Sequence, residues 1–139
     1  MILLDASGLF AYLNEPDAHR ESIQRVFDAE QGSLVMSPFV LGELDYLMTT
    51  RVDTEAELAL LDDVVRGAYS LVEFSSGELA DARAIIARYA DLKIGLADAS
   101  IVVLAGKLGC SRVLTLDERH FRALRTPAGD PFVVLPADS

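Results

Sequence analysis

The chain has 139 residues, 51% of them hydrophobic and 24% charged, with 22 acidic against 12 basic side chains and a formal net charge of −10. This balance predicts one folded domain over residues 1–139 and excludes disordered and low-complexity classes. A single cysteine, Cys110, excludes an internal disulfide and a cysteine-based zinc cluster. Because no signal-peptide pattern or long apolar run is seen, we expect a cytoplasmic protein.

Short apolar runs alternate with helix-like patterns in the first half of the chain. The pattern predicts a strand at 1–4, a helix at 17–31, a strand at 33–37 and a helix from Pro38 to about Thr50. Thr54 and Glu57 form a capping-box pattern, which predicts that another helix begins there.

The second half of the chain repeats this alternation. A strand is predicted at 71–74, and Ser75 with Glu78 forms a second capping-box pattern before a helix. The last predicted elements are a helix at 96–108 that ends at Gly109, and strands at 112–116 and 132–135. This alternation favours an α/β domain with a mainly parallel five-stranded sheet flanked by helices.

Two acidic residues occupy apolar positions of predicted helices. Glu43 follows Val40 by three residues and precedes Leu47 by four, so we expect its side chain to point toward the core, whereas Asp45 projects from another side. Asp98 lies in the same way on the apolar stripe of the helix at 96–108. Taken singly, each carboxylate could be explained by an ion pair or a helix cap, or by a metal ion.

Two further acidic residues directly follow predicted strands: Asp5 after the first and Asp117 after the fourth. Each could cap the next helical turn, but the carboxyl ends of parallel strands also border the ligand crevice of such sheets. Four converging carboxylates require cations in order to ionise together, and oxygen ligands suit Mg²⁺ or Mn²⁺. The pattern therefore predicts a metal site for hydrolysis of phosphate esters, in a chain otherwise too acidic to bind nucleic acid tightly.

Four sequence blocks carry a resemblance to a known family. They are LDAS at 4–7, SPFVLGEL at 37–44, LADASI at 96–101 and LTLDERHF at 114–121. In their order and spacing these blocks resemble PIN-domain ribonucleases, and specifically the VapC toxins of bacterial type II toxin–antitoxin modules. The resemblance extends over nearly the whole chain. It implies the PIN-like three-layer α/β fold with a parallel five-stranded sheet.

By this resemblance the chain is expected to be an endoribonuclease that cuts RNA such as tRNA or rRNA, with Mg²⁺ or Mn²⁺ as cofactor. The resemblance implies that the catalytic, metal-binding residues are Asp5, Glu43, Asp98 and Asp117. It implies that Ser7 and Thr115 orient the metal ligands or a water molecule. It also implies a homodimer inhibited by a VapB antitoxin, which we expect to bind in a groove among the helices between residues 17 and 69.

Basic residues near the last acidic block are candidates for RNA contact. Arg119, Arg122 and Arg125 recur every three residues after Asp117, and Arg112 begins the preceding strand. We expect these arginines to contact phosphates, the alternative being that they are ordinary solvated charges. His120 could donate a proton in the site or could be a surface histidine.

Two other functions fit parts of the pattern. A PIN-like domain with a degraded site would act only through protein partners, but it would have no need of four acidic residues at these positions. A phosphoacceptor receiver domain is also a small acidic α/β fold. It requires paired acidic residues after the first strand and a lysine after the fifth, whereas Ala6 follows Asp5 here and no lysine follows Lys107. Whether one or two metal ions bind stays open.

Overall fold

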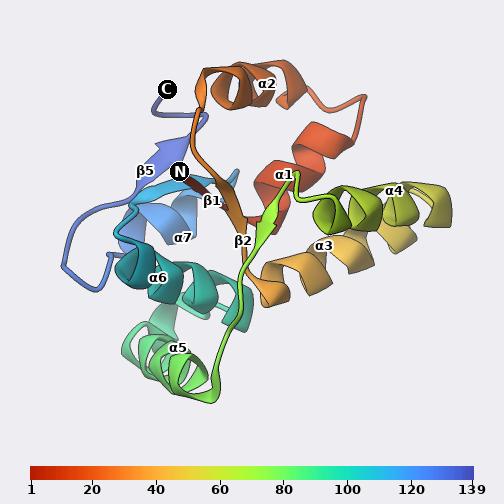
Figure 1. Cartoon of the computed structure of the whole chain (residues 1–139). Helices are drawn as coiled ribbons and strands as arrows, with labels where there is room; N and C mark the ends of the chain where they lie inside the picture. The colour runs from red at the N-terminus through yellow and green to blue at the C-terminus, as the bar shows by residue number, and fades with distance from the viewer.

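The chain folds into seven α-helices and one sheet in a computed structural model that describes all 139 residues (Figure 1). The strands are β1 Ile2–Leu4, β2 Leu34–Met36, β3 Ser70–Leu71, β4 Arg112–Leu114 and β5 Val133–Leu135. The helices are α1 Ala6–Leu13, α2 Arg20–Ala29, α3 Pro38–Arg51, α4 Thr54–Val65, α5 Ser76–Arg88, α6 Leu96–Leu108 and α7 Glu118–Ala123, with a short 3-10 helix at Ala90–Leu92.

All five strands run parallel, in the order β3-β2-β1-β4-β5, which confirms the predicted parallel sheet. The central strand is β1, whose Leu3 lies opposite Val35 of β2 on one side and Val113 of β4 on the other. After β1 the chain continues to β2 on one side and later returns to β4 on the other. The carboxyl ends of β1 and β4 therefore meet at a topological switch point, where open α/β sheets bind their ligands.

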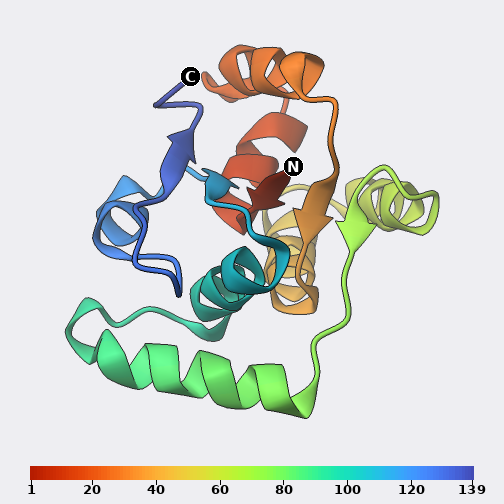
Figure 2. The ribbon, with the colours of Figure 1, turned by 60° about the vertical axis from the view of Figure 1, so that its left-hand side comes forward.

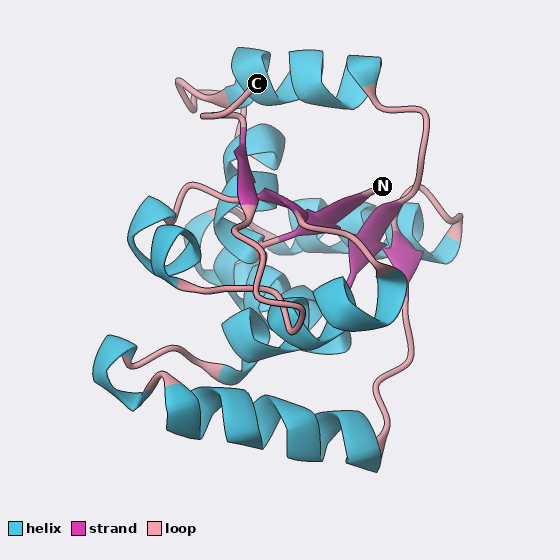
Figure 3. Cartoon of the chain, turned by 90° about the vertical axis from the view of Figure 1, so that its left-hand side faces the viewer, coloured by secondary structure: helices cyan, strands magenta, loops and turns pink.

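Helices lie on both sides of the sheet (Figure 3). Helix α6 packs against β1, and α5 packs against α6 on the side away from the strands (Figure 2). Helix α3 contacts α1, α4 and α6, so the first turns of α3 and α6 are held near the same end of the sheet. None of the helices has the length and apolar character needed to cross a membrane.

The hydrophobic core, a single cluster of 31 buried residues, fixes the elements that carry the candidate site. Strand β1 is buried at every position, and α6 is buried without a break from Ala99 to Ala105. The predicted end of α6 is confirmed: Gly109 adopts a left-handed conformation with φ of 63°, which glycine tolerates best. Asp98, in the first turn of α6, is thus attached to a rigid element.

Helix α1 approaches β4 closely because residue 8 is a glycine. A Cβ atom at Gly8 would lie 2.8 Å from the carbonyl oxygen of Leu114, which is too close for any other residue without movement of the backbone. Asp5 immediately precedes α1, and Thr115 immediately follows β4. The glycine therefore helps to bring these two residues together.

Several local predictions differ from the structure. The strand predicted at 71–74 is observed only at Ser70–Leu71. Helix α7 was not predicted, because its six residues are too few to show a helical period. Helix α1 was not predicted, because most of its positions are buried or half-buried and it has no clear polar face. The capping box at Thr54 and Glu57 is wrong: Asp53 is the residue that caps α4, accepting a hydrogen bond of 2.8 Å from the Ala56 N–H. The capping box at Ser75 and Glu78 is confirmed, with both of its hydrogen bonds at 3.2 Å.

Candidate metal centre

A pocket of about 330 Å³ contains the four acidic residues predicted from the sequence. They come from four separate segments: the end of β1, the middle of α3, the first turn of α6 and the loop after β4. The residues that line the pocket are Asp5, Ser7, Glu43, Gly95, Leu96, Ala97, Asp98, Asp117 and His120. The fold thus collects carboxylates that lie far apart in the sequence.

Asp5 is the most buried of the four carboxylates, with 5% of the residue exposed. It stands at the N-terminus of α1 but its side chain makes no capping hydrogen bond. Instead, its Oδ2 atom accepts hydrogen bonds of 2.7 Å from Ser7 Oγ and from Thr115 Oγ1. Burial raises the pKa of Asp5, although these hydrogen bonds act in the opposite direction.

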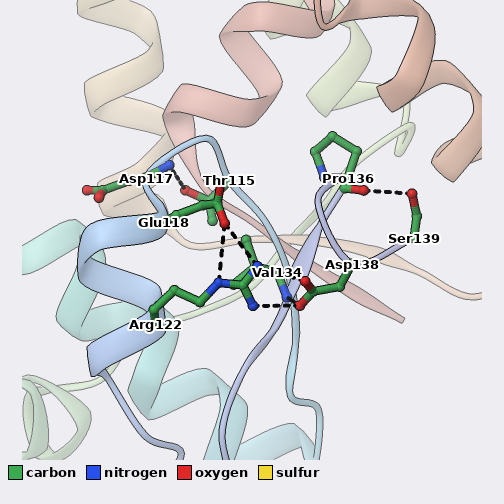
Figure 4. Close-up of polar contacts among 8 residues, drawn as sticks. All are labelled: Thr115, Asp117, Glu118, Arg122, Val134, Pro136, Asp138 and Ser139. Atoms are coloured by element: carbon green, nitrogen blue, oxygen red, sulfur yellow. Dashed lines mark hydrogen bonds and ion pairs between the residues drawn. The ribbon is translucent and has the colours of Figure 1, made fainter.

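The same two hydroxyl groups tie the site to the segment after β4. Ser7 Oγ accepts a hydrogen bond of 3.1 Å from the Leu116 N–H. Thr115 Oγ1 accepts a hydrogen bond of 2.9 Å from the Asp117 N–H, which Figure 4 shows. Both hydroxyls therefore contact the Asp5 carboxylate and the backbone that carries Asp117. This network holds the two strand-end carboxylates in a fixed relative position.

Asp117 caps a helix and also faces the pocket. One carboxylate oxygen, Oδ1, accepts a hydrogen bond of 3.1 Å from the His120 N–H at the start of α7. The other, Oδ2, lies 2.8 Å from Nδ1 of the His120 ring. The sequence left open whether Asp117 caps a helix or lies in the metal site, and the structure shows that it can do both.

The ionisation of Asp98 is shifted by burial and by its charged neighbours. Its side chain is 16% exposed, and Oδ2 lies 3.3 Å from His120 Nδ1. Burial, followed by the carboxylate of Asp5, raises the pKa of Asp98 to about 7, while His120 opposes the shift. A divalent cation in the pocket would stabilise the charged carboxylates that now disfavour one another.

Glu43 lines the pocket but is exposed, so the prediction that its side chain points toward the core was wrong. The buried face of α3 is formed by Val40, Leu44 and Met48, and Glu43 lies one position away from that face. Partial burial, and then the carboxylate of Asp5, raise the pKa of Glu43. Glu43 therefore lies at the open side of the pocket, where its charge interacts with the carboxylate of Asp5.

Three of the lining residues could hold a cation as they stand. Asp98, Asp117 and His120 each offer one ligand atom, and these atoms lie within 4.8 Å of one another. Asp5 and Glu43 border the same pocket without belonging to this tight group. The donor set, mainly carboxylate oxygens, fits a hard divalent cation. The sequence did not single out His120 as a ligand; the available signal was its spacing of three residues from Asp117 at the start of a helix.

The four arginines predicted to contact RNA do not form one cluster. Arg112, at the first position of β4, lies at the end of the sheet opposite to the pocket and pairs there with Glu30. Glu30 also accepts a hydrogen bond of 3.0 Å from the N-terminal amine of Met1. Arg112 is thus part of an ion-pair network that joins β1, β4 and the end of α2.

The other three arginines lie on α7 or just after it. Arg122 donates two hydrogen bonds to Asp138 and also pairs with Glu118 (Figure 4). Arg125 donates to backbone carbonyl groups, including that of Arg122. Arg119 is exposed and takes part in none of the ion pairs, so its charge is available to a ligand.

Known proteins resemble this chain over most of its length. The PIN domain family matches residues 2–126. Ribonuclease VapC26 of Mycobacterium tuberculosis (strain ATCC 25618 / H37Rv) is 41% identical over 135 residues, which are 97% of this chain and 100% of VapC26.

Solved structures share the fold at lower identity. VapC20 of Mycobacterium tuberculosis, a sarcin–ricin loop cleaving toxin, has a TM-score of 0.75 and 20% identity, covering 81% of this chain and 87% of that chain. DNA-bound VapBC from Salmonella typhimurium has a TM-score of 0.68 and 23% identity, and the match covers 96% of this chain and 98% of that chain.

Proposed function

Because the chain belongs to the PIN-domain family and is a member of its VapC ribonucleases, we propose that it is a Mg²⁺- or Mn²⁺-dependent endoribonuclease toxin. Its substrate is RNA of the tRNA or rRNA class. Its catalytic metal site is formed by Asp5, Glu43, Asp98 and Asp117. The observation that carries this proposal is the convergence of these carboxylates, from four segments of the chain, in one pocket.

The donor set supports a divalent cation in this pocket. Asp98 and Asp117 lie close enough together to hold it, with Asp5 beside them as a buried carboxylate. When bound, such a cation offsets negative charge on the scissile phosphate and makes a water molecule a better nucleophile. Without a cation the crowded carboxylates repel both one another and an incoming phosphodiester.

Ser7 and Thr115 are positioning residues in this proposal. Their hydrogen bonds to Oδ2 fix the orientation of the Asp5 carboxylate. Because the same hydroxyls bind the backbone at Leu116 and Asp117, a shift of one carboxylate would disturb the other.

Glu43 is suited to proton transfer at the open side of the pocket. Hydrolysis adds water across the bond between phosphorus and the 3′ oxygen, so the water must lose a proton and the 3′ oxygen must gain one. A carboxylate with a raised pKa accepts and returns a proton more readily near neutral pH than an ordinary glutamate does. The products of this reaction carry 5′-phosphate and 3′-hydroxyl ends.

We also propose a VapB-type antitoxin as the partner of this chain, and a homodimer as its assembly. Three large apolar side chains on α3 and α4 support a protein partner: Tyr46 is 67% exposed, Leu58 55% and Val65 86%. Apolar side chains spaced along a helix pair are the kind of surface on which an amphipathic segment docks.

The chemistry of the RNA ends tests the proposed hydrolysis. Purified protein with Mg²⁺ or Mn²⁺ is expected to cut total bacterial RNA into discrete fragments with 5′-phosphate ends, and EDTA is expected to abolish the cut. Fragments with 5′-hydroxyl and cyclic 2′,3′-phosphate ends would contradict the proposal, because they arise from attack by the 2′-hydroxyl of the RNA itself. A folded, metal-loaded protein that cuts nothing would favour a non-catalytic interaction module.

A further inference from the structure

The ring of His120 lies between two carboxylates of the proposed metal site. Its Nδ1 atom is 2.8 Å from Asp117 Oδ2 and 3.3 Å from Asp98 Oδ2. The backbone helps to place it, because the His120 N–H donates to the other oxygen of Asp117. The imidazole is thus held against both side chains that could bind a cation.

His120 Nδ1 is buried and has no hydrogen-bond partner. The two carboxylate oxygens are near enough for ion pairing, but neither meets the ring nitrogen in the direction that a hydrogen bond requires. No other buried side-chain nitrogen or oxygen of the protein lacks a partner. A buried polar atom without a partner is costly, and a bound ion is one of the few features that would supply one.

A ligand role for this nitrogen would change the metal preference of the site. Mg²⁺ takes oxygen ligands almost exclusively in proteins, whereas first-row transition ions accept imidazole nitrogen readily. We propose that His120 Nδ1 is a direct ligand of the cation and makes the site prefer a first-row transition ion such as Mn²⁺ over Mg²⁺. This inference rests on the proposed function, since it adds a ligand to the same site.

The chain provides a matched control, because its only other histidine is His19. The ring of His19 also lies near a carboxylate, with Nδ1 3.0 Å from Asp17 Oδ1, but its side chain is 55% exposed and it does not line the pocket. His19→Asn removes an imidazole beside an aspartate and leaves the site untouched. His120→Asn replaces the nitrogen ligand by an amide of similar size.

The test is pulsed electron paramagnetic resonance of Mn²⁺ bound to the full-length protein, together with binding titrations of Mn²⁺ and Mg²⁺. The wild type and His19→Asn are expected to show nitrogen modulation from a coordinated imidazole. In wild type labelled with ¹⁵N-histidine, the modulation frequencies should change from those of ¹⁴N to those of ¹⁵N. His120→Asn is expected to lose the modulation and to bind Mn²⁺ about tenfold more weakly, with less than about a threefold change for Mg²⁺.

The outcomes separate the two proposals. Mn²⁺ that binds the wild type without nitrogen modulation would overturn the role of His120 and leave the carboxylate site intact. Equal losses of Mn²⁺ and Mg²⁺ affinity in His120→Asn would also overturn the metal preference. If the wild type binds neither ion and still cleaves RNA, the metal site of the proposed function fails as well.

Discussion

Thr115 donates a hydrogen bond of 2.7 Å to Oδ2 of Asp5 across 110 residues of sequence. The contact exists because β1 and β4 are neighbours in the sheet and both end at this point, so that Asp5 and Thr115 lie side by side. Asp5 needs such a partner, since a buried carboxylate without hydrogen bonds is strongly disfavoured. The central strands therefore determine the geometry of the site directly.

Removal of the Thr115 hydroxyl should weaken the site without removing a ligand. Thr115→Val is expected to lower the rate of RNA cleavage about 10- to 100-fold, as for other residues that orient metal ligands. Thr115→Ser, which keeps the hydroxyl, should retain most of the activity. Thr126→Val is the control, because Thr126 is also buried and hydrogen-bonded but does not line the pocket. Equal cleavage by Thr115→Val and the wild type would refute the positioning role.

A pair of glycine substitutions tests the close approach of α1 to β4. Gly8→Ala is expected to lower the free energy of unfolding by about 1–3 kcal/mol, because the new methyl group would overlap Leu114. Gly42→Ala, in α3, meets no atom within 4 Å and should raise the free energy of unfolding by about 0.5–1 kcal/mol. Denaturant unfolding of both variants measures the difference, and a Gly8→Ala variant at least as stable as the wild type would show that the approach at Gly8 is not tight.

The pH dependence of stability should reveal the carboxylate crowding. The pKa of Asp98 is about 7 in the folded protein against 3.8 for an ordinary aspartate, so between these values the folded state binds more protons than the unfolded chain. The free energy of unfolding of the metal-free protein should therefore fall as the pH rises from about 4 to about 7, by at most about 4 kcal/mol from this residue.

Two variants and added metal test whether Asp98 causes this fall in the free energy of unfolding with rising pH. Asp98→Asn should flatten it, whereas Asp81→Asn, on the exposed side of α5, should not. Excess Mn²⁺ should restore stability at neutral pH in the wild type but less so in Asp98→Asn. Thermal unfolding at a series of pH values provides the data. Stability that rises between pH 5 and 7 in the metal-free wild type would be the opposite of this expectation.

The arginines should separate into structural and RNA-contacting residues. Arg119→Met is expected to weaken RNA binding and to reduce its dependence on salt concentration, because an exposed charge available to phosphate is lost. Arg112→Met should instead lower stability, since it leaves Glu30 without one of its partners, and should leave RNA binding unchanged. RNA-binding titrations at several salt concentrations measure the contribution to RNA binding, and thermal unfolding of the same variants measures the contribution to stability. A loss of RNA affinity in Arg112→Met alone would reverse the assignment.

The sheet was predictable because its strands are short apolar runs bounded by turns and polar residues. The strand at 112–116 and the helix at 96–108 were placed well, since burial on both sides gives strands a continuous apolar sequence and Gly109 marks the end of the helix. Helix α1 was missed because a helix buried on nearly all sides lacks the polar positions that reveal helical periodicity.

The candidate site was predictable in its membership but not in its detailed geometry. Asp5 and Asp117 could be placed from the strand ends alone, whereas Glu43 was given the wrong side of α3 because Leu47 rather than Met48 was taken as the buried position. The contact of His120 with Asp98 joins the beginnings of α7 and α6, which no local pattern in the sequence places near one another.

Cleavage of a defined RNA by the wild type, Asp5→Asn, Asp98→Asn and Asp62→Asn tests the central claim most directly. Asp62 is an exposed aspartate of α4, so its variant controls for the loss of one negative charge. With saturating Mn²⁺, the wild type and Asp62→Asn should cut at equal rates, and both site variants should lose about 100-fold or more. Cleavage at the wild-type rate by folded Asp5→Asn and Asp98→Asn would contradict the claim that these carboxylates form the active site.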